Sequence, residues 1–363
     1  MKEARILALG GDGIGPEVLA SGIKVAQHLC KIGNIKLDIE YDLIHGSCYE
    51  KYGVFCREET IMKARESDAV LVGAVGGSEW DNIEIEGGPE MQDGLMRLRK
   101  SLDCFIGLRP AKSWKGLEHL SSLKTDLLDE TNILVLREMT GGVMFASPRG
   151  RENISGKRYA FDTAAYNEDE ISRFAHVGFK IARQRNKSLF SVDKSNVMES
   201  YILWREIVDE VSKEYPDVEL KHIYADNCAY QMIKKPNNFD VILSCNFLGD
   251  LLSDLSGVIS GSLGMLPSAC LSSFNNPNEP NFGIYEPVHG SAPDLVGKQV
   301  ANPIGMILSV GMMINYSFAR SDLNDILIDA IAKTLNNGFL TDDLGGSLST
   351  KKMTEKICEN INQ

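Results

Sequence analysis

The first 75 residues alternate between strand-like and helix-like segments, and this alternation restricts the fold more than any other feature of the sequence. Apolar runs at residues 5–9, 36–43 and 69–75 predict strands, and the segments that begin at Pro16 and Arg57 predict helices. Strands separated by helices form βαβ units, whose strands lie parallel in one sheet. The sequence therefore predicts an α/β protein with a largely parallel sheet.

The loop GGDGIG between the first strand and the first helix contains four glycines but departs from a dinucleotide fingerprint. In G-x-G-x-x-G counted from Gly11, the third glycine position is occupied by Pro16. The loop thus predicts a tight strand-to-helix turn near a ligand and does not indicate a Rossmann domain.

Length and charge limit the classes of function. A chain of 363 residues with 43% hydrophobic and 24% charged residues can bury a large core, and its length suggests two domains. The formal net charge of -12 and the lack of basic runs argue against a nucleic acid or an anionic membrane as partner. No apolar run approaches the ~20 residues that span a bilayer. An anionic substrate would need local arginines.

The cysteines indicate the compartment. Eight cysteines show neither a C-x-x-C pair nor a zinc-site spacing, and we expect them to be reduced apolar residues. The strand-like run 4–9 follows the first residues directly, without a signal or transit pattern, so we expect a cytoplasmic protein.

Two carboxylates follow the apolar strand DVILSC. Asp250 and Asp254 are four residues apart on a predicted helix, so they lie on one face and repel each other. Residues 236–297 contain no Lys or Arg to relieve that repulsion. A solvated acidic face is the simpler interpretation, but the position after a buried strand, where α/β sheets bind ligands, favours a divalent cation such as Mg²⁺ or Mn²⁺.

Three arginines favour anion binding. Arg99 ends a helical segment in which Leu95 and Met96 lie on the same face, and Arg109 and Arg137 belong to strand-like segments. A core stripe with a snorkelling arginine explains that helix equally well. Three arginines in series in an acidic protein nevertheless favour a carboxylate ligand with an aliphatic tail.

Four functional side chains occupy the same kind of position. Arg137 ends its predicted strand, and Lys194, Asp226 and Asp250 each follow a predicted strand. Carboxyl ends of parallel strands meet at one edge of a sheet, so the four would converge if their strands are neighbours.

The segment EPVHGSAPDLVGKQVANP is rich in Gly, Pro and small residues that let a backbone approach a flat ligand. His289 offers a ring, and Asp294 offers an acceptor for ribose hydroxyls that would disfavour the extra phosphate of NADP. Lys298 works against that preference.

Taken together, the motifs resemble a known family. The runs GDGIGPEV, LRKSLD, LRPAK, LREMTGG, SVDKSNV, GDLLSDLSG, EPVHGSAPD and DLGGS stand in the order found in the isocitrate/isopropylmalate dehydrogenase family of metal-dependent oxidative decarboxylases. They span almost the whole chain.

The resemblance implies an isopropylmalate dehydrogenase-like, non-Rossmann fold with two domains and a large mixed sheet. Residues 1–104 and 261–363 would form the cofactor-binding domain, and residues 105–260 the substrate, metal and dimerisation domain. It also implies a homodimer with shared active sites, to which one subunit contributes Lys194 and Asp226 and the other contributes the arginines, Asp250 and Asp254.

The implied reaction is NAD-dependent oxidative decarboxylation of 3-isopropylmalate or a close 3-alkylmalate in leucine biosynthesis. The arginines would hold the carboxylates, Leu95 and Met96 would contact the alkyl group, and Lys194 would act as base. Asp226, Asp250 and Asp254 would bind Mg²⁺ or Mn²⁺. The implied NAD-binding residues are Gly77, Glu90, Glu286, His289, Gly290, Ser291, Ala292, Asp294 and Asn302.

Two departures from the family pattern stand out. Met144 replaces a tyrosine that would protonate the enol, and a thioether cannot donate a proton. Tyr230 or a water could substitute, since Tyr230 shares a predicted helical face with Asp226. A non-catalytic regulatory subunit, or an enzyme for a tartrate-like or alkylthiomalate substrate, is the alternative. The second departure is an insert around residues 275–281.

Overall fold

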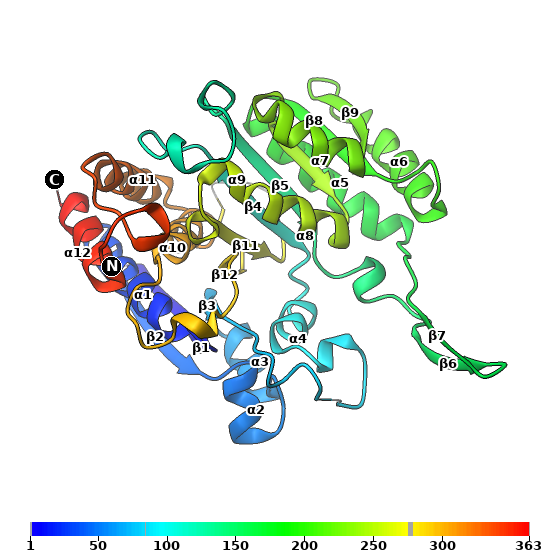
Figure 1. Cartoon of the computed structure of the whole chain (residues 1–363), viewed down its shortest axis with the longest axis horizontal. Coiled ribbons are helices and arrows are strands. Elements are labelled where there is room, and N and C mark those ends of the chain that lie inside the picture. The colour runs from blue at the N-terminus through cyan, green and yellow to red at the C-terminus, as the bar shows by residue number, and fades with distance from the viewer. Residues whose placement is uncertain (1, 84, 275–278, 363) are drawn as a thin grey trace.

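The computed structural model describes residues 2–83, 85–274 and 279–362, and one ten-stranded sheet runs through this part of the chain (Figure 1). Its strand order is β2-β1-β3-β12-β11-β4-β5-β10-β8-β9. The strands are β1 Lys2–Gly11, β2 Ile35–Asp42, β3 Ala69–Ala74, β4 Ile106–Lys112, β5 Asn132–Glu138, β8 Ser188–Asp193, β9 Glu219–Tyr224, β10 Val241–Ser244, β11 Pro267–Leu271 and β12 Gly283–Pro287.

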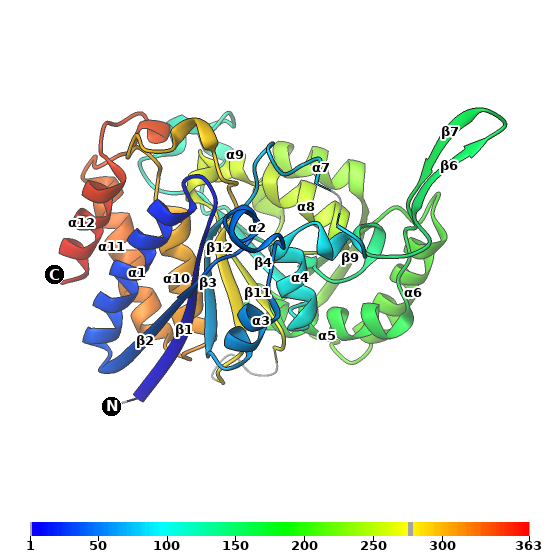
Figure 2. The same ribbon diagram turned by 90° about the horizontal axis from the view of Figure 1, so that it is seen from below.

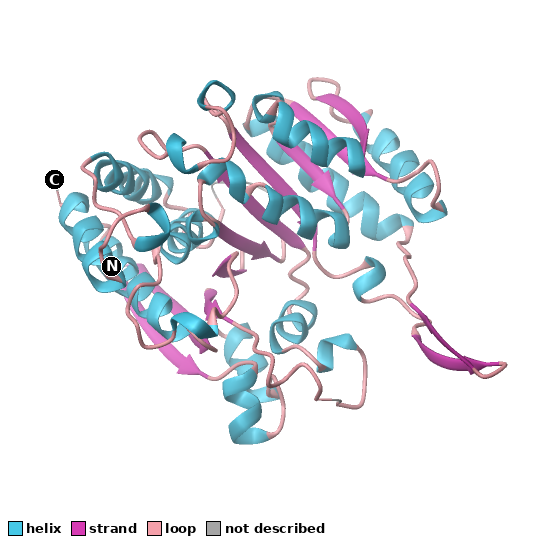
Figure 3. Cartoon of the chain, in the orientation of Figure 1, coloured by secondary structure: helices cyan, strands magenta, loops and turns pink. Residues whose placement is uncertain are grey.

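Helices cover both faces of the sheet (Figure 3). They are α1 Gly15–Ile32, α2 Gly46–Tyr52, α3 Glu58–Arg65, α4 Gly94–Ser101, α5 Glu168–Gln184, α6 Glu199–Ser212, α7 Ala225–Lys234, α8 Asn246–Leu255, α9 Gly257–Ser260, α10 Ile304–Tyr316, α11 Ser321–Asn336 and α12 Thr350–Ile361. Two-sided coverage explains why β3 and β10 are apolar runs in which every residue is buried. In the described residues, no helix is both long and apolar enough to cross a membrane.

The sheet is mixed, as the resemblance implies. Parallel pairings join β2, β1, β3 and β12 at one side and β5, β10, β8 and β9 at the other. Antiparallel pairings of β11 with β12, of β11 with β4 and of β4 with β5 connect the two parallel groups. The βαβ pattern predicted the parallel groups, but nothing local in the sequence indicated the antiparallel centre.

The two ends of the chain pack together. Helix α1 contacts α10 and α12, and Figures 1 and 2 show these elements beside β1 and β2. Helix α10 is buried along almost its whole length, which explains its nearly unbroken apolar sequence. This packing brings the first and last thirds of the chain onto the same part of the sheet.

The polar segment after Met144 forms a projecting ribbon. Strands β6 Gly150–Ile154 and β7 Lys157–Phe161 pair only with each other, and Figures 1 and 2 show them extending away from the sheet. All but one of their residues are exposed. The central residues of the predicted insert, 275–278, lie outside the described part of the chain.

Candidate active site

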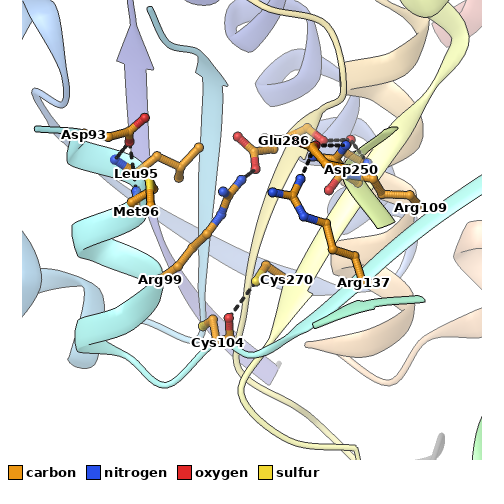
Figure 4. Close-up of polar contacts among 12 residues, drawn as sticks. Asp93, Leu95, Met96, Arg99, Cys104, Arg109, Arg137, Asp250, Cys270 and Glu286 are labelled. Atoms are coloured by element: carbon orange, nitrogen blue, oxygen red, sulfur yellow. Dashed lines mark hydrogen bonds and ion pairs between the residues drawn. The ribbon is translucent and has the colours of Figure 1, made fainter. Parts of the chain in front are cut away.

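Three arginine side chains converge where β4 and β5 meet α4 (Figure 4). Arg99 lies in the last turn of α4, Arg109 in β4 and Arg137 near the end of β5. All three are buried, with at most 9% of each residue exposed. Burial and the neighbouring Arg109 lower the pKa of Arg137 to about 10, which still leaves it charged at neutral pH.

The first turn of α4 orients this cluster. The side chain of Asp93 caps the helix by accepting from the Leu95 and Met96 amides at 2.8 and 2.9 Å. Leu95 is buried in an apolar cluster that includes Leu7 and Leu9, whereas Met96 is half-buried. The apolar face of α4 therefore serves the core through Leu95, and Met96 is the less enclosed of the two side chains expected to contact an alkyl group.

The carboxylates of α8 neutralise two of the arginines. Asp250 Oδ1 accepts from Arg137 and, at 3.2 Å, from Arg109, whose Nη1 also lies 3.3 Å from Asp254 Oδ1 and 2.8 Å from Ser253 Oγ. The expectation that this carboxylate pair lacks a nearby cation was therefore wrong. It considered only residues close in sequence, whereas β4 and β5 supply both charges.

Arg99 has a separate carboxylate partner. Its Nη2 donates to Glu286 Oε1 of β12, and both side chains are only about a tenth exposed. Burial acts to lower the pKa of Arg99, but the charge of Glu286, its hydrogen bond and the weaker effects of Cys270 and Asp93 together raise the pKa above its usual value. Arg99 Nε and Arg109 Nε are buried without a hydrogen-bond partner among the described residues. The cluster thus keeps unused donors that a carboxylate ligand could engage.

The four side chains predicted at strand ends do belong to neighbouring strands, since β5, β10, β8 and β9 are consecutive in the sheet. They nevertheless form two groups within one chain. Arg137 contacts Asp250, while Lys194 Nζ donates to Asp226 Oδ1 at 2.7 Å. The hydrogen bond from Lys194 lowers the pKa of Asp226. Across the described ranges, no three acidic, His or Cys side chains gather as a metal site.

A cavity of about 740 Å³ connects Lys194 and Asp226 with Met144. Met144 Sδ lies 3.5 Å from Arg137 Nη2, so Met144 contacts the arginine cluster as well. Tyr230 is exposed and does not line this cavity. Two other tyrosines, Tyr166 and Tyr201, do line it.

Sequence reasoning missed a buried network beside the arginines. Tyr166 donates to Glu138 Oε2 at 3.1 Å and accepts from the Asn246 amide at 2.9 Å, and Asn246 Oδ1 accepts from Arg137 Nε at 3.0 Å. Burial raises the pKa of Glu138 and of Tyr166. Only the position of Asn246, immediately after the strand that precedes Asp250, could have indicated this network.

The predicted cofactor residues are only partly brought together. His289, Gly290, Ala292 and Asn302 line a cavity of about 370 Å³, which Asp343 also lines. Asp343 Oδ2 accepts from Asn302 at 2.9 Å and from Ser262 at 2.6 Å. Asp343 belongs to the motif DLGGS, but the sequence did not indicate these contacts.

The remaining predicted cofactor residues lie elsewhere. Gly77 packs against Trp80, Glu90 pairs with Lys100, and Glu286 pairs with Arg99. Asp294 is exposed and does not line the cavity, and Ser291 is buried beneath it.

Ser291 joins the cofactor segment to the first glycine loop. Its carbonyl accepts from the Ile14 amide at 2.8 Å, and a Cβ on Gly13 would lie 2.0 Å from the same oxygen. Gly13 has a φ of +56°, so this close approach requires glycine. The GGDGIG loop therefore supports the segment that carries His289.

His289 offers an unsatisfied acceptor. Its Nδ1 lies 2.9 Å from the Gly290 carbonyl, which can only accept, so Nδ1 carries the proton. Nε2 is buried without a partner in the described residues, and burial lowers the pKa of the ring. A buried acceptor suits an amino group of a nucleotide base, so the residues present fit NAD.

Comparisons with known proteins identify the family of this chain. The sequence profile of the isocitrate/isopropylmalate dehydrogenase family matches residues 5–357. The chain belongs to that family.

Individual relatives agree. A 3-isopropylmalate dehydrogenase from Aquifex aeolicus is 47% identical over 99% of this chain and 98% of its own length, and one from Pseudomonas fluorescens (strain Pf0-1) is 46% identical over 98% and 97%. Among solved structures, isocitrate dehydrogenase from Methylococcus capsulatus superposes with a TM-score of 0.86 at 26% identity, covering 99% of this chain and 100% of that chain. A β-decarboxylating dehydrogenase from Thermococcus kodakarensis gives 0.77 at 28%, covering 99% and 96%.

Family membership confirms the predicted fold and identifies the chain as a dehydrogenase of the isocitrate/isopropylmalate type.

Proposed function

We propose that this protein catalyses the NAD-dependent oxidative decarboxylation of 3-isopropylmalate, or a close 3-alkylmalate, to the 2-oxo acid in cytoplasmic leucine biosynthesis. The observation that carries the proposal is the convergence of buried Arg99, Arg109 and Arg137 beside the α4 face that holds Met96. Relatives named for 3-isopropylmalate and covering nearly the whole chain support this substrate class.

In this proposal, the arginines bind the two malate carboxylates by exchanging their present partners for substrate oxygens. Bidentate guanidinium contacts fix the orientation of the substrate. Met96 and Leu95 border the alkyl group. A pocket of this kind discriminates between alkyl groups by ~1–3 kcal/mol.

Asp250 and Asp254 would supply two hard oxygen ligands for Mg²⁺ or Mn²⁺. They lie together on α8, so they fit half of such a site, and Asp226 of a second subunit would complete it. When bound, the cation would act as a Lewis acid towards the C2 hydroxyl and its neighbouring carboxylate. As the neutral amine, Lys194 would accept the hydroxyl proton and become an ammonium, and Asp226, 2.7 Å from its Nζ, would hold the side chain in place.

A second copy of the chain is the proposed partner. Apolar side chains are exposed on α7, which also carries Asp226, and on α8; they belong to Tyr230, Ile233, Phe247 and Leu251. A solvent-exposed apolar face of this kind is typical of a protein interface. We propose that it forms a homodimer and that residues 105–260 are its dimerisation domain, with 1–104 and 261–363 as the cofactor-binding domain.

NADH formation from 3-isopropylmalate, NAD and Mn²⁺ tests the activity, with isocitrate, tartrate and NADP as alternative reactants. Turnover on 3-isopropylmalate should exceed that on the other acids. Substrate binding without any NADH formation would instead indicate the non-catalytic, regulatory role that Met144 suggests.

Mixed dimers test site sharing. Lys194→Met and Asp250→Asn chains should each be inactive, but a hybrid dimer restores one complete site if Lys194 acts in the other subunit. Random mixing should then recover about a quarter of wild-type activity. No recovery, with dimers verified by light scattering, would mean that each site is built from one chain.

A further inference from the structure

A cavity of about 180 Å³ lies behind the arginine cluster, on the other face of β4 and β5. Pro110 and Lys112 line it and stand opposite Leu134 and Asn132 in the antiparallel register, and both of these residues also line it. Side chains alternate along a strand, so Arg109 points to the opposite face. The cavity is therefore separate from the proposed active site.

The lining is positively charged in a chain of net charge -12. It contains Lys112 and Arg185 and no Asp or Glu. Arg185 is neutralised by Asp240 at 2.7 Å, but Lys112 has no carboxylate within ion-pair distance in the described ranges. Burial lowers the pKa of Lys112, which shows that its charge is poorly solvated.

The rest of the wall combines apolar and polar groups, with a second aromatic ring from Tyr316 and polar side chains from Asn132, Asn315, Asn324 and Ser260. Lys112 Nζ lies 3.9 Å from the centroid of the Trp114 ring, and Leu308, Met312 and Ile328 contribute apolar surface from α10 and α11. A volume of about 180 Å³ is close to the ~150 Å³ of a cavity that holds one benzene-sized molecule. A ligand must therefore be small, with an apolar body for the aromatic and aliphatic part of the wall and one negative charge for Lys112.

We propose that this cavity binds a short, branched aliphatic monocarboxylate without an amino group, its carboxylate on Lys112 and its alkyl body against Trp114 and Leu308. An amino acid is disfavoured because its ammonium would lie near the unpaired charge of Lys112, while no Asp or Glu lines the cavity to accept from it. A dicarboxylate is disfavoured because its second charge would have only one unpaired cation to share.

The probe is 3-methylbutanoate, and the readout is fluorescence of Trp114, one of three tryptophans in the chain. Titration should give a saturable change that disappears in Trp114→Phe. Leucine and 3-methylbutan-1-ol should bind at least about tenfold more weakly, because the first adds an unpaired ammonium and the second lacks the charge. Equal binding of leucine would overturn the proposal.

Lys112→Met should weaken the binding of 3-methylbutanoate about tenfold or more. Lys115→Met, which alters a nearby exposed lysine, should leave that binding unchanged. Lys112→Met removes a poorly solvated charge, so its melting temperature should not fall. If it does fall, Ile328→Phe narrows the same cavity and should abolish the fluorescence change. A signal that persists in both Lys112→Met and Ile328→Phe, or that is absent from the wild type, refutes the site.

Discussion

The ion pair between Arg99 and Glu286 allows a quantitative test of the arginine cluster. The pair connects α4 to β12, and its side chains are only 11% and 10% exposed. Removing one partner of a buried pair costs ~3–5 kcal/mol, and the amide in Glu286→Gln retains a hydrogen bond, so we expect about 3 kcal/mol. Unfolding 363 residues at ~2.1 cal/mol/K each gives an entropy of about 0.8 kcal/mol/K, so the melting temperature should fall by about 4 °C.

The assay is calorimetric unfolding of Glu286→Gln and, as a double-mutant cycle, of Arg99→Met, Glu286→Leu and the variant that combines these two. Each single variant leaves a buried charge without its partner, whereas the double variant leaves none, so it should be more stable than either. The exposed pair of Lys100 and Glu90, at 2.8 Å, is the control and should show a coupling of at most ~1 kcal/mol. Strictly additive effects at Arg99 and Glu286 would refute the reasoning, because they would show that the two charges do not interact.

Three further predictions concern other parts of the molecule. Met144→Tyr should raise kcat by up to ~10²–10⁴-fold if protonation limits turnover, because a phenol can donate a proton into the cavity shared with Lys194. Met144→Phe, which lacks the hydroxyl, is the control. A lower kcat in Met144→Tyr would contradict the assignment of this position. Tyr166→Phe removes a donor from buried Glu138 and should destabilise by ~1–3 kcal/mol. Burial raises the pKa of Glu138, so the stability that this group contributes rises as pH falls. The Tyr166 hydroxyl acts against that shift because its hydrogen bond favours the ionised carboxylate, so the loss in Tyr166→Phe should be larger at pH 8 than at pH 5 in urea titrations. Finally, burial raises the pKa of all eight cysteine thiols. A thiol reagent at neutral pH should therefore label the native protein far more slowly than the urea-unfolded chain. Equally fast labelling of the native protein would contradict this prediction.

Sequence patterns predicted the elements that are locally encoded. The strands and helices that begin the chain, and the positions of Lys194 and Asp226 after their strands, follow from periodicity and lie where they were expected. The pairing of β4 with β5 could not be predicted in this way, because register between distant strands is set by tertiary packing. The partners of Asp250 were missed for that reason.

Arg109 and Arg137 both form ion pairs with Asp250. These ion pairs explain why the site would favour binding a dianion together with a divalent cation. A ligand carboxylate on Arg109 and Arg137 replaces Asp250 rather than adding to it, so the cluster exchanges one negative partner for another. The exchange frees Asp250 one helical turn from Asp254, and two unpaired carboxylates at that spacing repel each other. Burial already raises the pKa of Asp254, so a further free carboxylate nearby makes its charged form still less favourable. In the proposed mechanism, a divalent cation would remove this repulsion, and a substrate with a carboxylate for the arginines and a hydroxyl for the cation would satisfy both groups at once. A monocarboxylate without such a hydroxyl would leave the cation with fewer ligands, which is why this arrangement favours a hydroxy diacid over a simple acid.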